Sequence, residues 1–168
     1  MAATQSFDIT VGCDPQEIDN AVNQAAKEIS QRYDFKGLKV SVEFHRADNR
    51  IVLAGPDDYK LKAMWEVLQT KLVRRQVPLR NVKPGKIEPA AGGTVRQQLD
   101  VQQGIPTETA REIAKRIKDL KLKRVQAAIQ AEQVRVSSPS RDDLQSVISA
   151  LKQQDFGMEL KFGNYRTQ

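Results

Sequence analysis

Residues 125–136, VQAAIQAEQVRV, determine the fold of the second half of the chain. Apolar residues alternate with polar or small ones on both sides of Ala131-Glu132, which predicts two strands joined by a short turn. Strands joined by so short a turn pair as an antiparallel hairpin. This hairpin is therefore the centre from which the neighbouring elements can be placed.

An amphipathic helix is expected on each side of the hairpin, over residues 106–120 and 140–151. Ser140 is a good N-cap for the second of these helices. Alternating residues predict one more strand before the first helix, at 95–101, and another after the second helix, at 158–162. The resulting order, β-α-β-β-α-β, is that of the ferredoxin-like unit.

The first half of the chain repeats this order. Strands are expected at 6–12, 38–44 and 51–53, and a weaker one at 79–83. Helices begin after Asp14-Pro15 and after Asp57, where an aspartate can cap the first turn. The predicted fold class is α+β, a tandem of two ferredoxin-like (RNP-like) βαββαβ domains. Each domain is an antiparallel sheet with two helices on one face and the other face open.

Residues 84–94 contain two prolines and three glycines, a composition typical of a linker. We therefore expect a first domain at residues 1–83, a linker at 84–94 and a second domain at 95–168. One alternative remains open at this point. The N-terminal strand of either half could pair with the sheet of the other half, which would make the domains discontinuous in sequence.

The chain has 168 residues and a formal net charge of +6. The charge is concentrated in two segments, because residues 71–86 carry six basic and no acidic side chains and residues 111–124 carry seven basic and two acidic ones. Such segments form either solvated helix faces or a surface that contacts phosphate groups. The second interpretation predicts an anionic partner.

Several classes of protein are disfavoured by composition and motifs. One cysteine, Cys13, and one histidine, His45, leave no internal disulfide, no zinc-finger spacing and no convincing catalytic pair. The Walker A and Rossmann glycine patterns are absent from the sequence. No apolar run is long enough to cross a bilayer and the N-terminus does not resemble a signal peptide. We expect a cytoplasmic protein that is not an enzyme and needs no cofactor.

The open sheet faces are predicted to be polar rather than aromatic. Glutamine and arginine side chains, which can hydrogen-bond to bases and phosphates, dominate the expected strands of the second half. The alternative is that this polar face packs against the sister domain or a second copy. The preferred phosphate site is the corner between the helix at 106–120 and the following strand. The candidate residues on this face and corner are Arg96, Gln98, Lys121, Lys123, Arg124, Gln126 and Arg135.

Eight stretches of the sequence resemble the YajQ family of small bacterial proteins over nearly the whole chain. They are Ser6-Phe7-Asp8-Ile9, Tyr33-Asp34-Phe35-Lys36-Gly37, Gly104-Ile105, Ile117-Lys118-Asp119 with Lys121-Leu122-Lys123, Val125-Gln126-Ala127 with Ile129-Gln130, Val134-Arg135-Val136, Arg141-Asp142-Asp143-Leu144-Gln145, and Phe162 with Asn164-Tyr165-Arg166. The resemblance implies a tandem of RNP-like domains that binds nucleotides without established catalysis. It adds Arg141 to the candidate nucleotide-binding residues.

The resemblance also implies possible ligands and partners. Nucleotides, a cyclic dinucleotide such as cyclic di-GMP, and RNA are the expected ligands. One alternative function, implied by the resemblance, is a cyclic di-GMP effector that changes its affinity for a transcription factor. The other, which follows from the open sheet faces and the linker, is a protein-interaction adaptor that docks a partner there. No metal site and no membrane partner are expected.

Overall fold

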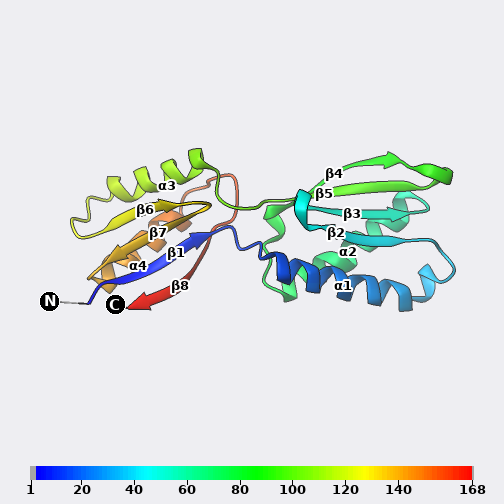
Figure 1. The fold of residues 1–168 in the computed structure, drawn as a ribbon, viewed down its shortest axis with the longest axis horizontal. Helices are drawn as coiled ribbons and strands as arrows, with labels where there is room; N and C mark the ends of the chain where they lie inside the picture. Colours follow the sequence, from blue (N-terminus) through cyan, green and yellow to red (C-terminus); the bar gives the residue numbers. More distant parts are fainter. Residues whose placement is uncertain (1–2, 168) are drawn as a thin grey trace. The chain divides into compact units, whose positions relative to one another are not determined.

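The structure is a computed structural model that describes residues 3–167 (Figure 1). It contains two compact units that do not follow the two halves of the sequence. The terminal unit combines the N-terminal segment through Val11 with the residues from Gln103 onward. The central unit is Gly12–Gln102. Each unit is described separately below.

The terminal unit is a four-stranded antiparallel sheet with the order β6-β7-β1-β8. Its helices α3 and α4 contact each other and the strands of the same sheet. Its elements along the chain are β1 (Gln5–Thr10), α3 (Thr107–Asp119), β6 (Gln126–Gln130), β7 (Gln133–Ser138), α4 (Arg141–Lys152) and β8 (Lys161–Thr167). This is a complete βαββαβ unit with β1 and β7 in the centre of the sheet.

The central unit has the same architecture but begins at its first helix. Its sheet order is β2-β3-β5-β4, and α1 and α2 pack together over the sheet. Its elements are α1 (Pro15–Gln31), β2 (Ser41–His45), β3 (Arg50–Gly55), α2 (Asp58–Arg74), β4 (Val82–Pro89) and β5 (Val95–Val101). Strand β5 occupies the central position that β1 occupies in the terminal unit. The expected fold, two ferredoxin-like units with antiparallel sheets and two helices each, is confirmed.

The predicted helix starts are also confirmed. Asp14 accepts a hydrogen bond from the backbone N–H of Gln16 (2.9 Å), and Pro15 occupies the first turn. Asp57 accepts one from Lys60 N–H (2.8 Å). Ser140 Oγ accepts one from the N–H of the third helical residue (3.2 Å). Each cap satisfies a donor that the first turn leaves without an intrahelical partner.

Alternating residues bury one face of each sheet under its helices. In the terminal unit Phe7, Ile9 and Val134 are completely buried, together with Ile113 of α3. In the central unit the largest fully buried side chains are Ile18, Ile29, Ile51, Leu53, Leu61, Met64, Leu68, Leu72 and Leu99. Each large apolar side chain of this kind contributes roughly 1.5–3 kcal/mol by leaving water. The opposite face of each sheet carries the polar side chains.

The expected domain boundaries, 1–83, 84–94 and 95–168, differ from these units. Strand β1 pairs with β7 and β8, whereas β5 pairs with β3 and β4, so the two halves of the sequence exchange a strand. Most of the expected linker is strand β4. Proline is tolerated there because β4 is an edge strand with a register shift between Pro84 and Ile87, where not every N–H has to join the ladder.

Two expected strands are displaced. The strand predicted at 79–83 begins at Val82 and continues to Pro89, and the strand predicted at 158–162 runs from Lys161 to Thr167. The second strand continues past Gly163 through Asn164, which has a φ of 54°. At this point the pairing between β8 and β1 shifts its register. Among the described residues no helix has the length and apolarity that crossing a membrane requires.

Candidate functional site

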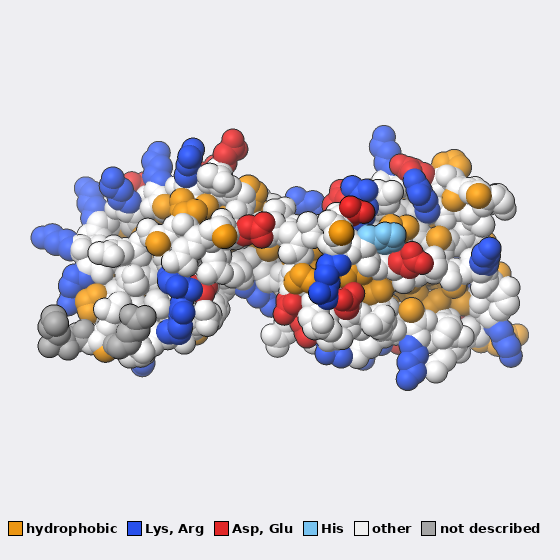
Figure 2. Space-filling model, viewed as in Figure 1, with side chains coloured by type: hydrophobic (Ala, Val, Ile, Leu, Met, Phe, Trp, Pro, Cys, Tyr) orange, Lys and Arg blue, Asp and Glu red, His pale blue; other side chains and the backbone are white. Residues whose placement is uncertain are grey.

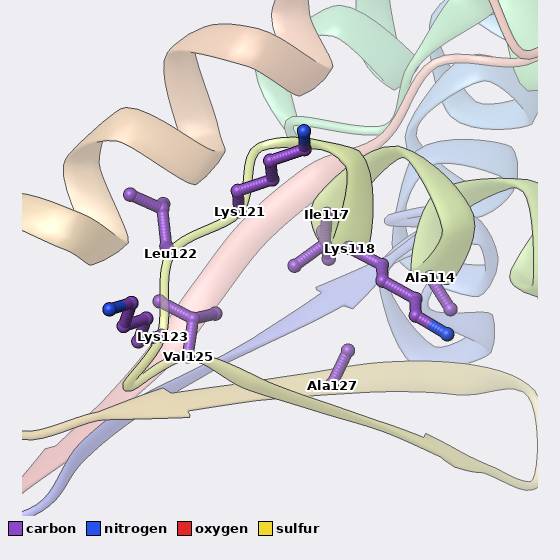
Figure 3. A pocket seen from close by; sticks show the side chains of 8 residues that line it. All are labelled: Ala114, Ile117, Lys118, Lys121, Leu122, Lys123, Val125 and Ala127. Atoms are coloured by element: carbon purple, nitrogen blue, oxygen red, sulfur yellow. The ribbon is translucent and has the colours of Figure 1, made fainter.

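The corner after α3 forms a pocket of about 490 Å³, which we call the lysine pocket (Figure 3). Three elements of the terminal unit line it: the last turns of α3, the following loop and the start of β6. The lining residues are Ala114, Ile117, Lys118, Lys121, Leu122, Lys123, Val125 and Ala127. Two of the residues predicted for the phosphate site, Lys121 and Lys123, are therefore part of one cavity.

The local sequence explains why the lysines surround an apolar floor. Helix α3 is amphipathic and buries Ala110, Ile113 and Ile117, which leaves Lys118 on its exposed side. Lys121 then adopts a left-handed conformation, with φ 56°, and its N–H donates to Lys118 O (3.0 Å). This conformation ends the helix and turns the chain toward β6. Only a few per cent of residues other than glycine have a positive φ.

The pocket is cationic and amphipathic. Lys118, Lys121 and Lys123 are exposed, and no described acidic side chain lies within salt-bridge distance of their ammonium groups. Cations are favourable at the C-terminus of any helix, so their position alone does not identify a site. The apolar floor is the distinguishing feature, because a cavity with a few polar groups over an apolar floor is typical of small-molecule sites.

The lysines belong to a larger cationic surface. Figure 2 shows Lys and Arg side chains gathered along α3 in the terminal unit. Arg111 and Lys115 are exposed on this helix and, with Lys118, recur at helical spacing. Arg124 is exposed beside the pocket but does not line it.

The other predicted residues are not brought into the lysine pocket. Arg96 and Gln98 lie on β5 of the central unit, where Arg96 is 3.6 Å from Glu88. Their strand was expected in the sheet of the second domain, but β5 pairs with β3 and β4, which is the strand exchange that the sequence left open. The remaining candidates belong to the terminal unit but lie on other elements: Gln126 on β6, Arg135 on β7 and Arg141 at the start of α4.

Arg135 belongs to a cluster that the sequence analysis did not identify. Asp8 of β1 is only 4% exposed, and Arg135 donates two hydrogen bonds to it, from Nε (2.8 Å) and from Nη2 (3.3 Å). Asn164 Nδ2 donates a third (2.6 Å), and Arg166 Nη2 lies 3.8 Å from Oδ1. The hydrogen bonds from Arg135 lower the pKa of Asp8, against the opposing effect of burial. We call these four residues the Asp8 cluster.

The sequence of strand β1 contains a signal for this cluster. Asp8 is an ionisable residue between the core residues Phe7 and Ile9 on a strand that becomes central in the sheet. A carboxylate at such a position requires charged or hydrogen-bonding partners. Its partners come from β7 and β8, which lie more than a hundred residues away, so their identity depends on the strand exchange.

A second pocket in the terminal unit, of about 360 Å³, contains Arg141. It is lined by Gln5, Ser6, Arg141, Leu144, Gln145, Tyr165, Arg166 and Thr167. Arg141 Nε donates a long hydrogen bond to Gln5 Oε1 (3.4 Å), and the Tyr165 side chain is 61% exposed. This pocket lacks the apolar floor of the lysine pocket and has Leu144 as its one aliphatic side chain.

The basic segment 71–86 is partly neutralised in the central unit. Lys71 Nζ donates to Glu28 Oε1 (2.8 Å), which lowers the pKa of Glu28, and Arg75 lies 3.7 Å from Glu17. Arg74 and Lys71 line a surface pocket between α1 and α2. Because acidic partners already engage two of its cations, this segment is a weaker candidate for an anion site than the lysine pocket.

The fold and the pocket together define a class of protein: an α+β protein of two ferredoxin-like units with a cationic, apolar-floored site in one of them. Residues 5–166 match the family described as "Nucleotide-binding protein YajQ-like". The chain belongs to this family, as its resemblance in sequence predicted.

Curated relatives are similar over almost their whole length. A protein of Carboxydothermus hydrogenoformans is 51% identical over 166 residues, which cover 99% of this chain and 100% of the relative. A protein of Solibacter usitatus is 49% identical over 162 residues, covering 96% and 97%. One of Elusimicrobium minutum is 47% identical over 164 residues, covering 98% and 99%. All three carry the name "Nucleotide-binding protein".

Proposed function

We propose that this chain is a non-enzymatic nucleotide-binding protein and that the lysine pocket holds the nucleotide. The exposed side chains of Lys118, Lys121 and Lys123 point in different directions in Figure 3 and would turn toward the phosphate to contact it. The base would lie against the apolar floor formed by Ile117, Val125 and their neighbours. The observation that supports this most directly is the combination of three unpaired lysines and an apolar floor in one cavity of about 490 Å³. That volume lies within the usual range for small-molecule sites.

The composition of the pocket supports binding rather than catalysis. Its lining has no carboxylate, imidazole, thiol or hydroxyl group. These groups provide general acid–base and nucleophilic catalysis in most enzymes, and the lysine amines, the one such residue type in the lining, have no second catalytic group beside them there. The relatives' name points to the same function. We place this activity in the cytoplasm, which agrees with a single, buried cysteine.

Among nucleotides, the pocket favours a compact ligand over a polymer. One cavity with three lysines matches a mononucleotide or one half of a cyclic dinucleotide such as cyclic di-GMP. RNA would have to extend from the pocket along the exposed cations of α3, and its binding would weaken steeply with salt. Control of a transcription factor by the bound nucleotide would follow as a further step.

The test is isothermal titration of the full chain with AMP, GMP, cyclic di-GMP and a short RNA at several salt concentrations. The pocket variant replaces Lys118, Lys121 and Lys123 by alanine. An exposed ion pair contributes about 0.5–1 kcal/mol, so three lost contacts should weaken binding by about ten- to a hundredfold. A control replaces Lys36, Lys39 and Lys62, which are exposed in the central unit, and changes the net charge equally.

The control should alter the dissociation constant by less than about threefold, because screened charges outside the site contribute little. Absence of binding by every ligand at low salt would refute nucleotide binding. Equal losses in the two triple variants would show that the ligand responds to net charge and not to the pocket. Hydrolysis of a nucleotide by the pure protein would refute the non-enzymatic assignment.

A further inference from the structure

Strand β6 differs from the other three edge strands of the two sheets. An edge strand exposes unpaired backbone groups, and natural proteins protect it with charges, prolines or bulges. Strand β4 has Pro84 and Pro89, β8 has the irregularity at Asn164, and β2 has the polar pair Glu43 and His45, whose side chains lie 3.2 Å apart. Strand β6, with the sequence QAAIQ, has none of these devices. Its edge is therefore available to another strand.

The register of the hairpin shows which groups of β6 face outward. Gln130 pairs with Gln133 across the two-residue turn, so these two residues hydrogen-bond to each other. The pattern then alternates along the ladder, and Ala128 and Gln126 also bond to β7. The N–H and C=O groups of Ala127 and Ile129 consequently point away from the sheet. Within residues 3–167 no other segment donates to or accepts from them.

The side chains of Ala127 and Ile129 lie on the helix side of the sheet, opposite the buried residues Val136 and Val134. Ala127 lines the lysine pocket, as Figure 3 shows, and Ile129 is 43% exposed. A strand added beside β6 would place every second side chain on this side, next to the apolar floor. The free edge thus adjoins an apolar groove.

The charge around this groove specifies the partner. Lys118, Lys121 and Lys123 lie at the pocket and Arg124 lies two residues before the start of β6, with no described acid paired to them. Strand addition obtains affinity from main-chain hydrogen bonds and specificity from pockets for alternate side chains. Here those pockets favour apolar residues, and the surrounding cations favour carboxylates.

We propose that β6 is a docking edge for an acidic, extended peptide of a partner protein. The peptide adds to the terminal unit as a fifth strand through the outward groups of Ala127 and Ile129. Its apolar side chains lie on the groove beside α3, and carboxylates at the end of the peptide that continues past Gln126 lie near the lysines. This interaction goes beyond the proposed nucleotide binding, since its principal contacts are backbone groups of a strand edge.

The test measures fluorescence anisotropy of labelled peptides added to the full chain. The probe is a short capped peptide in which valine alternates with serine at the centre and glutamates flank this centre at both ends, and its matched control has lysine in place of glutamate. Two further probes carry N-methyl groups on alternate amides, in one register or in the other. Because alternate N–H groups of a strand face opposite sides, only one register removes the donors that face β6.

The glutamate probe should bind saturably, and the lysine probe should not. One N-methyl register should weaken binding by about tenfold or more, and the other should leave it within about twofold. Equal effects of the two registers, or no saturable binding of the glutamate probe, would overturn the proposal. The N-methyl comparison uses the unaltered protein, so it does not depend on the folding of a variant.

Two protein variants provide a second comparison. Ile129→Pro removes an outward N–H without removing a ladder bond to β7 and should abolish binding of the glutamate probe. Ile129→Val keeps the N–H and the strand and should retain binding. Sedimentation of the free chain tests a different occupant. A dimer that forms through β6 and is lost in Ile129→Pro, with no peptide binding, would contradict the proposal.

Discussion

Replacing Asp8 by asparagine tests whether the Asp8 cluster stabilises the terminal unit. The substitution keeps the shape of the side chain but removes the charge that Arg135 and Arg166 share. It also turns one acceptor into a donor that faces the donors of Arg135 and Asn164. A hydrogen bond to a charged group contributes about 1.5–3 kcal/mol.

The size of the effect follows from the exposure of the partners. The Asp8 side chain is 5% exposed, but that of Arg135 is 30% exposed and that of Arg166 is 40% exposed, so water can partly replace the lost contacts of both guanidinium groups. We therefore expect Asp8→Asn to lower the free energy of unfolding by about 2 kcal/mol and not by the sum of its contacts.

The central unit offers a matched control. Asp100 on β5 lies opposite Arg50 on β3, and these strands are the counterparts of β1 and β7. The Asp100 side chain is 72% exposed and lies 3.4 Å from Arg50 Nε. An exposed pair of this kind contributes little, so Asp100→Asn should lower the free energy of unfolding by less than about 0.5 kcal/mol.

Urea unfolding followed by far-UV circular dichroism measures both variants, and hydrogen exchange of β1 and β7 peptides assigns the loss to the terminal unit. The effect should also depend on pH. Because the pKa of Asp8 is lowered in the folded state, its stabilisation is present above its unfolded pKa, about 3.9, and is lost as the pH falls through the lower folded value. Equal losses for Asp8→Asn and Asp100→Asn at neutral pH would refute this reasoning.

Two further substitutions test particular contacts. Gly104→Ala should lower the free energy of unfolding by about 2 kcal/mol or more, because the φ of residue 104 is +76° and the added Cβ would collide with the side chain of Glu132. Thermal unfolding followed by circular dichroism measures this loss, and an unchanged unfolding midpoint would contradict the prediction. Glu28→Gln should lower the free energy of unfolding by about 0.5–1 kcal/mol, because it weakens the ion pair to the nearly buried Lys71. Urea unfolding followed by the fluorescence of the single tryptophan, Trp65 in the same unit, measures this loss, and a variant more stable than the wild type would contradict the prediction.

The helices, most strands and the fold class could be predicted because they depend on local patterns. Alternating residues and amphipathic stripes mark the strands and helices, and Asp14, Asp57 and Ser140 mark three helix starts. Most of strand β4 was missed, since the weak strand predicted at 79–83 covers only its first two residues, because Pro84 and Pro89 suit an edge strand as well as a linker. Nothing in the local sequence separates these two cases, since the difference is whether a neighbouring strand is present.

The candidate site also has one part that local sequence could predict and one part that it could not. Lys121 and Lys123 could be placed together because they lie in one short loop after one helix. The Asp8 cluster could not, since Arg135 is 127 positions from Asp8 and Asn164 is 156 positions away. Arg96 and Gln98 were assigned to the wrong sheet for a related reason. Their strand was predicted correctly, but its pairing partner was not.

Local sequence alone therefore establishes the element types, the helix caps, the βαββαβ pattern and the cationic corner after α3. These follow from the conformational preferences and side-chain spacing of neighbouring residues. Only the tertiary structure shows that β1 lies in the sheet expected for β5 and that β5 lies in the sheet expected for β1. It also shows where Asp8 and Arg96 lie and that β6 has a free edge. A strand's alternation specifies which of its faces is buried, whereas its partner is chosen by the packing and hydrogen bonding of the whole sheet.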